Sequence, residues 1–399
     1  MHILQQTGES NKPGNRRARK GSISQRSKGS YQIRYNVFDA NGQRKQVNET
    51  FRGSKADAED LLAERQKEVR HGQYAEKSKL TLSDLMQQFL NEYCVPPKVR
   101  LRTRHGYEGQ IGRYINKSVR DGVPAIGHTH FQNLKPVQIK KLYADLLERG
   151  LSSTTVLHLH RLLKKVFNWA VGEGLASQNP LARVEAPAKG EYELAMWNIE
   201  TIHDFIDLCA DNQYGDVFQF AIRTGLRRSE ICGLQWDAVD LVEGRLRVIR
   251  TVHSINGIGL VVGEPKTKKS RRTIGLSAET VNLLHSVKGG QLDMGLPTSG
   301  AGYVFTRPSG LPLVPQVVTK HFTGFVRQHN LPKMNFHGLR HAYASLCLVA
   351  GIDSKYVSES LGHSTISTTL DLYSHIIPSM QQHAADAVAN LLKRGQRSD

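Results

Sequence analysis

Six side chains in the C-terminal half of the chain have the types that a phosphoryl-transfer reaction needs. They fall in four short stretches, TGLRRSE, PKTKKSRRTI, HGLRH and LGHSTISTTLDLYSH. Each residue alone is a weak indication, because a single histidine or tyrosine is more often structural than chemical. The set contains two arginines, a lysine, two histidines and a tyrosine: Arg227, Lys266, His337, Arg340, His363 and Tyr373.

Together these six side chains could break and rejoin a phosphodiester without a metal ion. Arginine forks neutralise the non-bridging oxygens as negative charge develops, a task that Mg²⁺ performs elsewhere. Tyr373 is the candidate nucleophile; because the pKa of a free tyrosine is about 10, it needs nearby positive charge and a proton acceptor such as His337. Lys266 is the candidate general acid for the departing alkoxide. The phosphotyrosine ester would store the bond energy, so we expect no ATP and no other cofactor.

The first two stretches predict local structures for their charged residues. Arg227 and Glu230 stand three residues apart and share one helix face, where they could also be an ordinary surface ion pair. GEPKTKKSRRTIGLS predicts a strand, a basic turn and a strand, with Lys266 at the edge of a hairpin. Lys268 and Lys269 in that turn are candidate phosphate contacts.

The last two stretches place their residues around helix ends. His337 and Arg340 lie three residues apart at a predicted helix start that is followed by an apolar run. His363 follows a glycine that is a predicted helix C-cap, and Tyr373 comes one short helix later. Two other tyrosines, Tyr343 in AYASL and the one in YVSESLGH, lie in predicted helices and are expected to pack.

The whole chain is strongly basic. Fifty-four Lys and Arg against 36 Asp and Glu give a formal charge of +18, which predicts a polyanionic partner, nucleic acid first. A solubilising surface or an anionic membrane face is the alternative, but no basic amphipathic helix or lipidation signal supports it. No run approaches the roughly 20 apolar residues that span a bilayer, and no signal peptide is visible, so we expect no membrane partner and a cytoplasmic protein. The four cysteines show no CxxC pair, so we expect reduced core thiols and no metal site.

The N-terminal part of the chain separates into a tail and a small module. Residues 1–20 are polar and basic and are expected to be disordered until bound. Residues 21–75 predict two strands, SYQIRYNVFD and RKQVNETF, and a capped helix. This strand-strand-helix module is suited to lie against a DNA groove, although a solvated sheet face would look the same. Its candidate DNA contacts are Tyr31, Arg34, Tyr35, Arg44 and Lys45.

The rest of the chain predicts a helical domain, a linker and a larger mixed domain. Residues 79–186 show helical apolar spacing with glycine stops, and their candidate phosphate contacts are Arg100, Arg102 and Arg104. Residues 187–193 are the predicted linker. Residues 194–399 predict a mainly helical domain with a small antiparallel sheet, including a hairpin that turns at Asn256-Gly257. We therefore expect an α+β multidomain protein, and no nucleotide-binding loop is present.

In the residues just described, the sequence resembles the tyrosine recombinase family, the integrases of phages and integrative conjugative elements. TGLRRSE, PKTKKSRRTI, HGLRH, LGHS and LDLYSH occur in the family order and together are highly specific. By this resemblance Arg227 is the first family arginine, Lys266 the hairpin lysine, and His337 with Arg340 the H-x-x-R pair. His363 would be the histidine after L-G. Tyr373 would be the nucleophile that forms a 3′-phosphotyrosine, and Glu230 a supporting acidic residue.

The resemblance also implies the domain roles and partners. Residues 21–75 would be the arm-type DNA-binding domain, 79–186 the core-binding domain and 194–399 the catalytic domain. Family members bind double-stranded DNA at core and arm attachment sites as a homotetramer, exchange strands through a Holliday junction, and integrate and excise a mobile element. An excisionase or a host DNA-bending protein is a candidate partner. The last helix often docks on a neighbour; here its apolar stripe could equally pack in cis: Ala384, Ala387, Val388, Leu391 and Leu392.

Three alternatives remain open at this stage. A type IB topoisomerase shares the covalent tyrosine chemistry but needs no site-specific N-terminal module. A metallohydrolase could use His337 and His341, four residues apart, but Gly338 stands where the general-base Glu of H-E-x-x-H would be. A catalytically inactive DNA-binding regulator is the third, and the filled catalytic positions argue against it.

Overall fold

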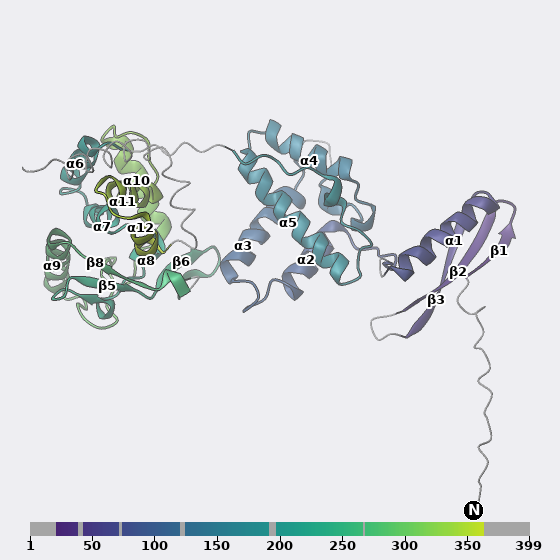
Figure 1. The fold of residues 1–399 in the computed structure, drawn as a ribbon, viewed down its shortest axis with the longest axis horizontal. Coiled ribbons are helices and arrows are strands. Elements are labelled where there is room, and N and C mark those ends of the chain that lie inside the picture. The colour runs from purple at the N-terminus through teal and green to yellow at the C-terminus, as the bar shows by residue number, and fades with distance from the viewer. Residues whose placement is uncertain are drawn as a thin grey trace, which may run out of the picture. The chain divides into compact units, whose positions relative to one another are not determined.

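The computed structural model describes residues 21–38, 43–71, 74–119, 124–190, 197–265 and 268–362, without the side chains of Phe38 and Lys268. The chain divides into two compact units, residues 1–191 and residues 192–399. The predicted α+β architecture is confirmed: a small sheet with one helix, a helical part, and a mainly helical part with small antiparallel sheets (Figure 1).

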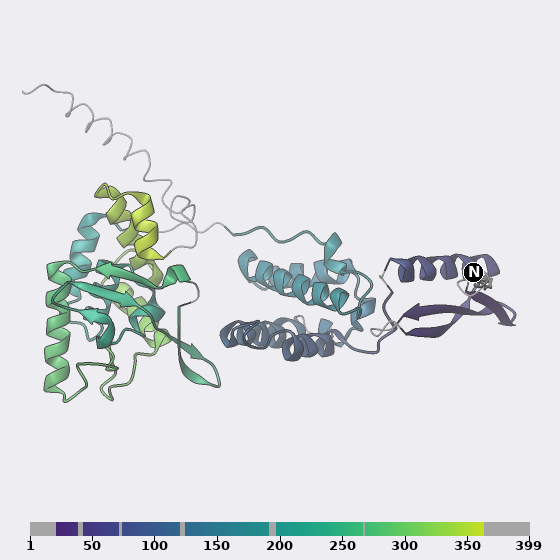
Figure 2. The same ribbon diagram turned by 60° about the horizontal axis from the view of Figure 1, so that its bottom comes forward.

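The first unit begins with three antiparallel strands and a helix that covers one face of their sheet (Figure 2). Ile33, Tyr35 and Val37 alternate along the central strand and pack with Ala58 of the helix. Ser54 begins the helix by a capping box with Asp57. The elements are β1 (Ser22–Ser27), β2 (Ser30–Phe38), β3 (Arg44–Arg52) and α1 (Lys55–Arg70).

The strand β1 was not predicted. Its sequence SISQRS contains a single apolar residue, Ile23, so it shows no alternating pattern of its own. It forms because β2 offers a free edge: Ser22 pairs with Arg34 and Ser24 with Gln32. The module is therefore three strands and a helix, and the prediction of two strands was incomplete.

Four α-helices follow in the described part of the first unit, and apolar spacing predicted three of them but not the helix Leu101–Gln110. Three of them each bury an apolar stripe in a shared core that contains Phe89, Phe131 and Phe167, whereas the helix Leu101–Gln110 has no buried residue of its own. Thr81 and Ser152 cap the starts of two of these helices. A π-helical turn, Ile111–Ile115, continues the second helix. The helices are α2 (Leu82–Glu92), α3 (Leu101–Gln110), α4 (Pro136–Glu148) and α5 (Ser153–Gly172).

The second unit contains the helix α7 (Gly215–Thr224) and an aromatic core. Phe218 of α7 meets Phe322 with ring centroids 5.3 Å apart, in an edge-to-face arrangement that favours tight packing. The helices are α6 (Ile199–Leu208), α7 (Gly215–Thr224), α8 (Arg228–Ile231), α9 (Ala278–Asp293), α10 (Pro315–Gln328), α11 (Phe336–Val349) and α12 (Ser354–Leu361). None of the helices in the described ranges combines the length and apolar character needed to cross a bilayer.

Two small sheets accompany these helices. Their strands are β4 (Val239–Asp240), β5 (Arg245–Val248), β6 (Thr251–Ile255), β7 (Gly259–Gly263) and β8 (Arg272–Gly275). The hairpin β6–β7 turns at Asn256-Gly257, as predicted, with Gly257 at a φ of 78°.

The predicted hairpin around Lys266 is wrong. β7 pairs with β6, whereas β8 pairs with β5 in a different sheet, so the strands on either side of the basic turn are not partners. The buried cross-strand pair Leu246 and Ile274 sets the register of β8 on β5. The basic segment is therefore a connection between two sheets.

Candidate active site

Arg227 lies at the start of α8, directly after the turn that ends α7. Gly225 ends α7 in the left-handed conformation, with a φ of 62°. The Arg227 backbone N–H then donates to Glu230 Oε2 at 2.9 Å, and its Nη1 donates to Glu230 Oε1 at 2.8 Å. The two residues predicted to share a helix face are thus paired, and the side chain of Arg227 remains 32% exposed.

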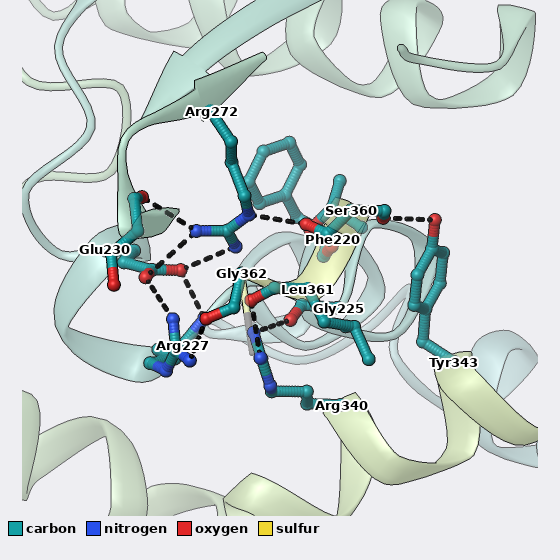
Figure 3. Close-up of polar contacts among 12 residues, drawn as sticks. Phe220, Gly225, Arg227, Glu230, Arg272, Arg340, Tyr343, Ser360, Leu361 and Gly362 are labelled. Atoms are coloured by element: carbon teal, nitrogen blue, oxygen red, sulfur yellow. Dashed lines mark hydrogen bonds and ion pairs between the residues drawn. The ribbon is translucent and has the colours of Figure 1, made fainter. Parts of the chain in front are cut away.

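Glu230 is a buried anion held between two arginines. It is 3% exposed, and a second arginine, Arg272 of β8, contacts both of its carboxylate oxygens (Figure 3). Burial raises the pKa of Glu230, but the hydrogen bonds and charge of Arg272 and the charge of Arg227 outweigh burial and lower that pKa below its ordinary value. Glu230 is therefore ionised at neutral pH, and it is not the exposed surface partner that a three-residue spacing also allowed.

Arg340 projects from the first turns of α11 into the same region. It is 2% exposed and donates from Nη1 to the carbonyl of Gly225 at 2.8 Å and from Nη2 to the carbonyl of Leu361 at 2.5 Å. Asn335 caps the start of α11 and so sets the phase in which Arg340 faces inward. The two predicted arginines, which are far apart in sequence, are brought to one place.

The meeting point is the C-terminal end of α12. The last carbonyls of a helix have no partner within the helix and carry partial negative charge. Here three successive carbonyls each accept from one arginine: Ser360 from Arg272, Leu361 from Arg340, and Gly362 from Arg227 at 2.9 Å (Figure 3). Gly362 is the predicted C-cap, with a φ of 65°. The next residue in the chain is His363.

The histidines of HGLRH lie one turn apart on α11. His337 is exposed, and its ring meets that of His341 with centroids 4.8 Å apart and planes at 85°. Burial, together with the charge of Arg340, lowers the pKa of His341. Within the described ranges, no group of three or more His, Cys, Asp or Glu side chains is arranged to hold a metal ion.

The other tyrosines near the motifs can be compared directly. Tyr343 packs on α11 with its hydroxyl 3.4 Å from Ser360 Oγ, and burial raises its pKa, which is opposite to what a nucleophile needs. Tyr356 lies on α12 and is 69% exposed. Lys266, His363 and Tyr373, together with the predicted C-terminal stripe, lie outside the described residues, so their roles stay predictions.

The candidate DNA contacts of the N-terminal module lie on both faces of its sheet. Cross-strand neighbours share a face, so Arg34 and Arg44 lie on the face opposite α1. Tyr31 packs against the core with α1. Tyr35 is 3% exposed and bonds Glu49, which contradicts a direct DNA contact from its side chain. Lys45 is on the α1 side and pairs with an acidic residue that follows the helix, Glu76.

The candidate phosphate contacts of the helical domain also differ in their surroundings. Arg104 donates to the carbonyl of Leu90 at 2.8 Å and to the Glu108 carboxylate at 2.9 Å, so its guanidinium ties the end of α2 to α3 rather than facing outward. Arg100 and Arg102 are exposed at the start of α3. Lys269 is exposed in the short turn Lys268–Ser270. These exposed cations remain predicted phosphate contacts.

Arg272 is the site residue that sequence analysis missed. Arg272 lies in the stretch PKTKKSRRTI, in which only the lysines were predicted to act, and its partner Glu230 is 42 residues away in sequence. No spacing rule links a strand residue to a helix residue at that distance. Only the pairing of β8 with β5 places Arg272 beside α8 and α12.

Comparisons with known proteins agree with these observations. The sequence profile described as the Phage integrase family matches residues 193–379. The tyrosine recombinase XerC-like protein of Caldanaerobacter subterraneus subsp. tengcongensis is 30% identical over 375 residues, which cover 88% of this chain and 94% of that protein.

Two solved structures share the fold. The Tn1549 transposon integrase in complex with transposon right end DNA is 22% identical with a TM-score of 0.64, covering 78% of this chain and 100% of that one. A lambda integrase tetramer bound to a Holliday junction is 16% identical with a TM-score of 0.55, covering 90% of this chain and 96% of that one. The arrangement of helices and small sheets is thus that of known integrases.

Proposed function

The chain belongs to the tyrosine recombinase family, whose members break and rejoin DNA at specific sites, and from this premise we propose that it is an integrase with Tyr373 as its nucleophile. Arg227, Lys266, His337, Arg340 and His363 would complete its catalytic set. Glu230 would support Arg227.

The observation that carries this proposal is the convergence of the predicted arginines on the end of α12. Arg227 comes from the turn before α8 and Arg340 from α11, and both bond the last carbonyls of α12. The chain continues from that point through His363 to Tyr373. A phosphate at this place would meet the guanidinium of Arg227, which is partly exposed and has donors to spare.

The proposed reaction is two successive transesterifications. The Tyr373 oxygen attacks the scissile phosphorus, its proton passes to a histidine, and a covalent 3′-phosphotyrosine forms. The P–O bond to the leaving strand breaks, and Lys266 donates a proton to that oxygen. The 5′-hydroxyl of a strand end from the partner duplex then gives up its proton and attacks the phosphotyrosine; the P–O bond to Tyr373 breaks, and the tyrosine oxygen regains a proton. Bond energy is conserved in the ester, so the reaction requires no nucleotide hydrolysis.

At the level of the assembly we propose a homotetramer on double-stranded DNA that acts through a Holliday junction. The fold shared with a lambda integrase tetramer bound to such a junction supports this proposal. Residues 21–75 would bind arm sites and residues 79–186 core sites, each through the exposed cations described above. Integration and excision of a mobile element, an excisionase or host bending protein, and a cytoplasmic location belong to the same proposal.

Covalent trapping tests the proposed chemistry. Full-length wild type and Tyr373→Phe are incubated with a nicked half-site from the candidate attachment region, in EDTA without ATP, and resolved on a denaturing gel. We expect a protein–DNA adduct with wild type only, while Tyr373→Phe binds the DNA equally well. An adduct formed by Tyr373→Phe would reject the nucleophile, and rapid relaxation of any supercoiled plasmid without paired sites would contradict the integrase function.

A further inference from the structure

Arg272 connects three separate elements through one guanidinium. It begins β8, and its Nη2 donates to Glu230 Oε2 of α8 at 2.9 Å. Its Nη1 reaches Glu230 Oε1 at 3.2 Å and the carbonyl of Ser270 at 3.1 Å, while Nε donates to the carbonyl of Ser360 at the end of α12 (Figure 3). The side chain is 7% exposed, so these contacts are shielded from water.

This arrangement needs an arginine. The planar fork presents donors along two edges, so one edge can hold a carboxylate while Nε reaches a carbonyl on another element. A lysine has one point charge and could not contact both Glu230 and Ser360 in this geometry. Gly362 leaves room for the fork, because a Cβ at that position would lie 3.2 Å from both Arg272 Cδ and Nη1.

Glu230 and the end of α12 are also the two groups that hold Arg227. Glu230 receives Arg227 on its Oε1 at 2.8 Å, and the carbonyl of Gly362 receives it at 2.9 Å. Arg272 therefore contacts the carboxylate and the helix end that orient Arg227. A shift in Arg272 would move both supports together.

We propose that Arg272 is a positioning residue for strand cleavage, which locks Glu230 and the end of α12 so that Arg227 and the chain leading to Tyr373 keep one geometry. This inference rests on the proposed function. It assigns Arg272 no contact with DNA.

The charges around Glu230 give the proposal a pH signature. Arg227 faces Glu230 from the turn before α8 and Arg272 faces it from β8. Arg247 and Arg250 line a small cavity with Glu230, but both guanidiniums donate to Asp237. Burial alone raises the pKa of Glu230, and Arg272 is the principal group that opposes it. Without Arg272, Glu230 gains a proton at a higher pH and releases Arg227.

The test measures single-turnover adduct formation on the nicked half-site at saturating DNA, from about pH 5 to pH 9, for full-length variants. Arg272→Gln, Arg272→Lys, and Arg272→Gln combined with Glu230→Gln are compared with wild type. Arg271→Gln is the matched control, because it removes the same charge one residue away, where the side chain is 52% exposed and pairs with the surface residue Glu264. The final amount of adduct gives the fraction of protein molecules that can cleave. The rate constant of adduct formation shows whether the catalytic groups of those molecules are correctly positioned.

We expect Arg272→Gln to slow adduct formation by about tenfold or more, as small misplacements of catalytic groups do. The pH below which its rate constant for adduct formation falls, the acid limb of the pH–rate profile, should move to a higher value. Adding Glu230→Gln to Arg272→Gln should abolish that shift. Arg272→Lys should keep the wild-type acid limb but remain slow, because the fork is lost. Arg271→Gln should keep both the rate constant and the acid limb.

Two outcomes would overturn the inference. A purely structural role would lower the amplitude and leave the rate constant and acid limb of Arg272→Gln at their wild-type values. If Arg272→Gln yields no folded protein, Arg272→Lys serves as the test. A wild-type rate constant of adduct formation in Arg272→Lys would show that the guanidinium fork is not needed. Failure of the proposed function would look different, since wild type would then form no adduct or Tyr373→Phe would form one.

Discussion

The turn at Gly225 offers the sharpest test of how the site is packed. Gly225 has a φ of 62°, and a Cβ added there would lie 2.4 Å from Cδ1 of Tyr343 and 2.8 Å from Cδ2 of Leu361. Gly351, after α11, has a φ of 79° with nothing within 4 Å of an added Cβ. The two glycines share a left-handed backbone and differ in the space around it, so Gly351→Ala is the matched control for Gly225→Ala.

The expected cost can be worked out from these contacts. A left-handed conformation costs a residue with a Cβ about 1–2 kcal/mol, so Gly351→Ala should lower the free energy of unfolding by that amount. At Gly225 the overlap with a rigid ring and a buried leucine adds about 1–3 kcal/mol, as overpacking does. Gly225→Ala should therefore cost roughly 2–5 kcal/mol in total.

Urea unfolding by tryptophan fluorescence measures this difference. Of the three tryptophans, Trp169 lies in the first unit, whereas Trp197 and Trp236 lie in the second. In a Trp169→Phe background, the signal reports only on the unit that contains Gly225. Equal destabilisation by Gly225→Ala and Gly351→Ala would refute the overlap argument, because the backbone term alone would then account for both.

Two further predictions concern the buried anion and the sheet face. Because the folded-state pKa of Glu230 lies below its ordinary value of 4.5, its ionisation stabilises the fold above that pH, and this contribution is lost as the pH falls through the folded pKa. Below about pH 4.5 the unfolding free energy of the second unit should therefore fall less steeply in Glu230→Gln than in wild type, as urea titrations would show; equal slopes would contradict the assigned ionisation. On the N-terminal module proposed to bind arm sites, Arg34→Gln should weaken binding to arm-site DNA and reduce the salt slope by about one, if the sheet face opposite α1 meets phosphates. Tyr35→Phe should leave the DNA affinity unchanged in the same titration, since the Tyr35 hydroxyl bonds Glu49 within the protein. A loss of DNA affinity with Tyr35→Phe but not with Arg34→Gln would indicate that the α1 side of the sheet binds the DNA.

Local patterns were sufficient to predict most of the elements. The helix α5 follows from apolar residues at helical spacing, which are visible within about twenty residues of sequence. The turn Asn256-Gly257 likewise predicted the hairpin β6–β7. Failures occurred where a strand depends on its pairing partner rather than on its own apolar pattern. SISQRS becomes β1 only beside β2, and β8 joins β5 rather than β7 because Ile274 is buried opposite Leu246.

The same division holds for the side chains of the site. By itself the sequence determined which residue types are available and their order along the chain, and those motifs indicated the family and the tyrosine chemistry. Tertiary structure decided how they are used. Burial placed Tyr35 in a core, and Arg104 became a tie between α2 and α3. Folding also joined Arg272 to Glu230 across 42 residues of sequence. The physical reason is that motif spacing encodes contacts within one helix or turn, whereas burial and ion pairing depend on elements that only the packed fold brings together.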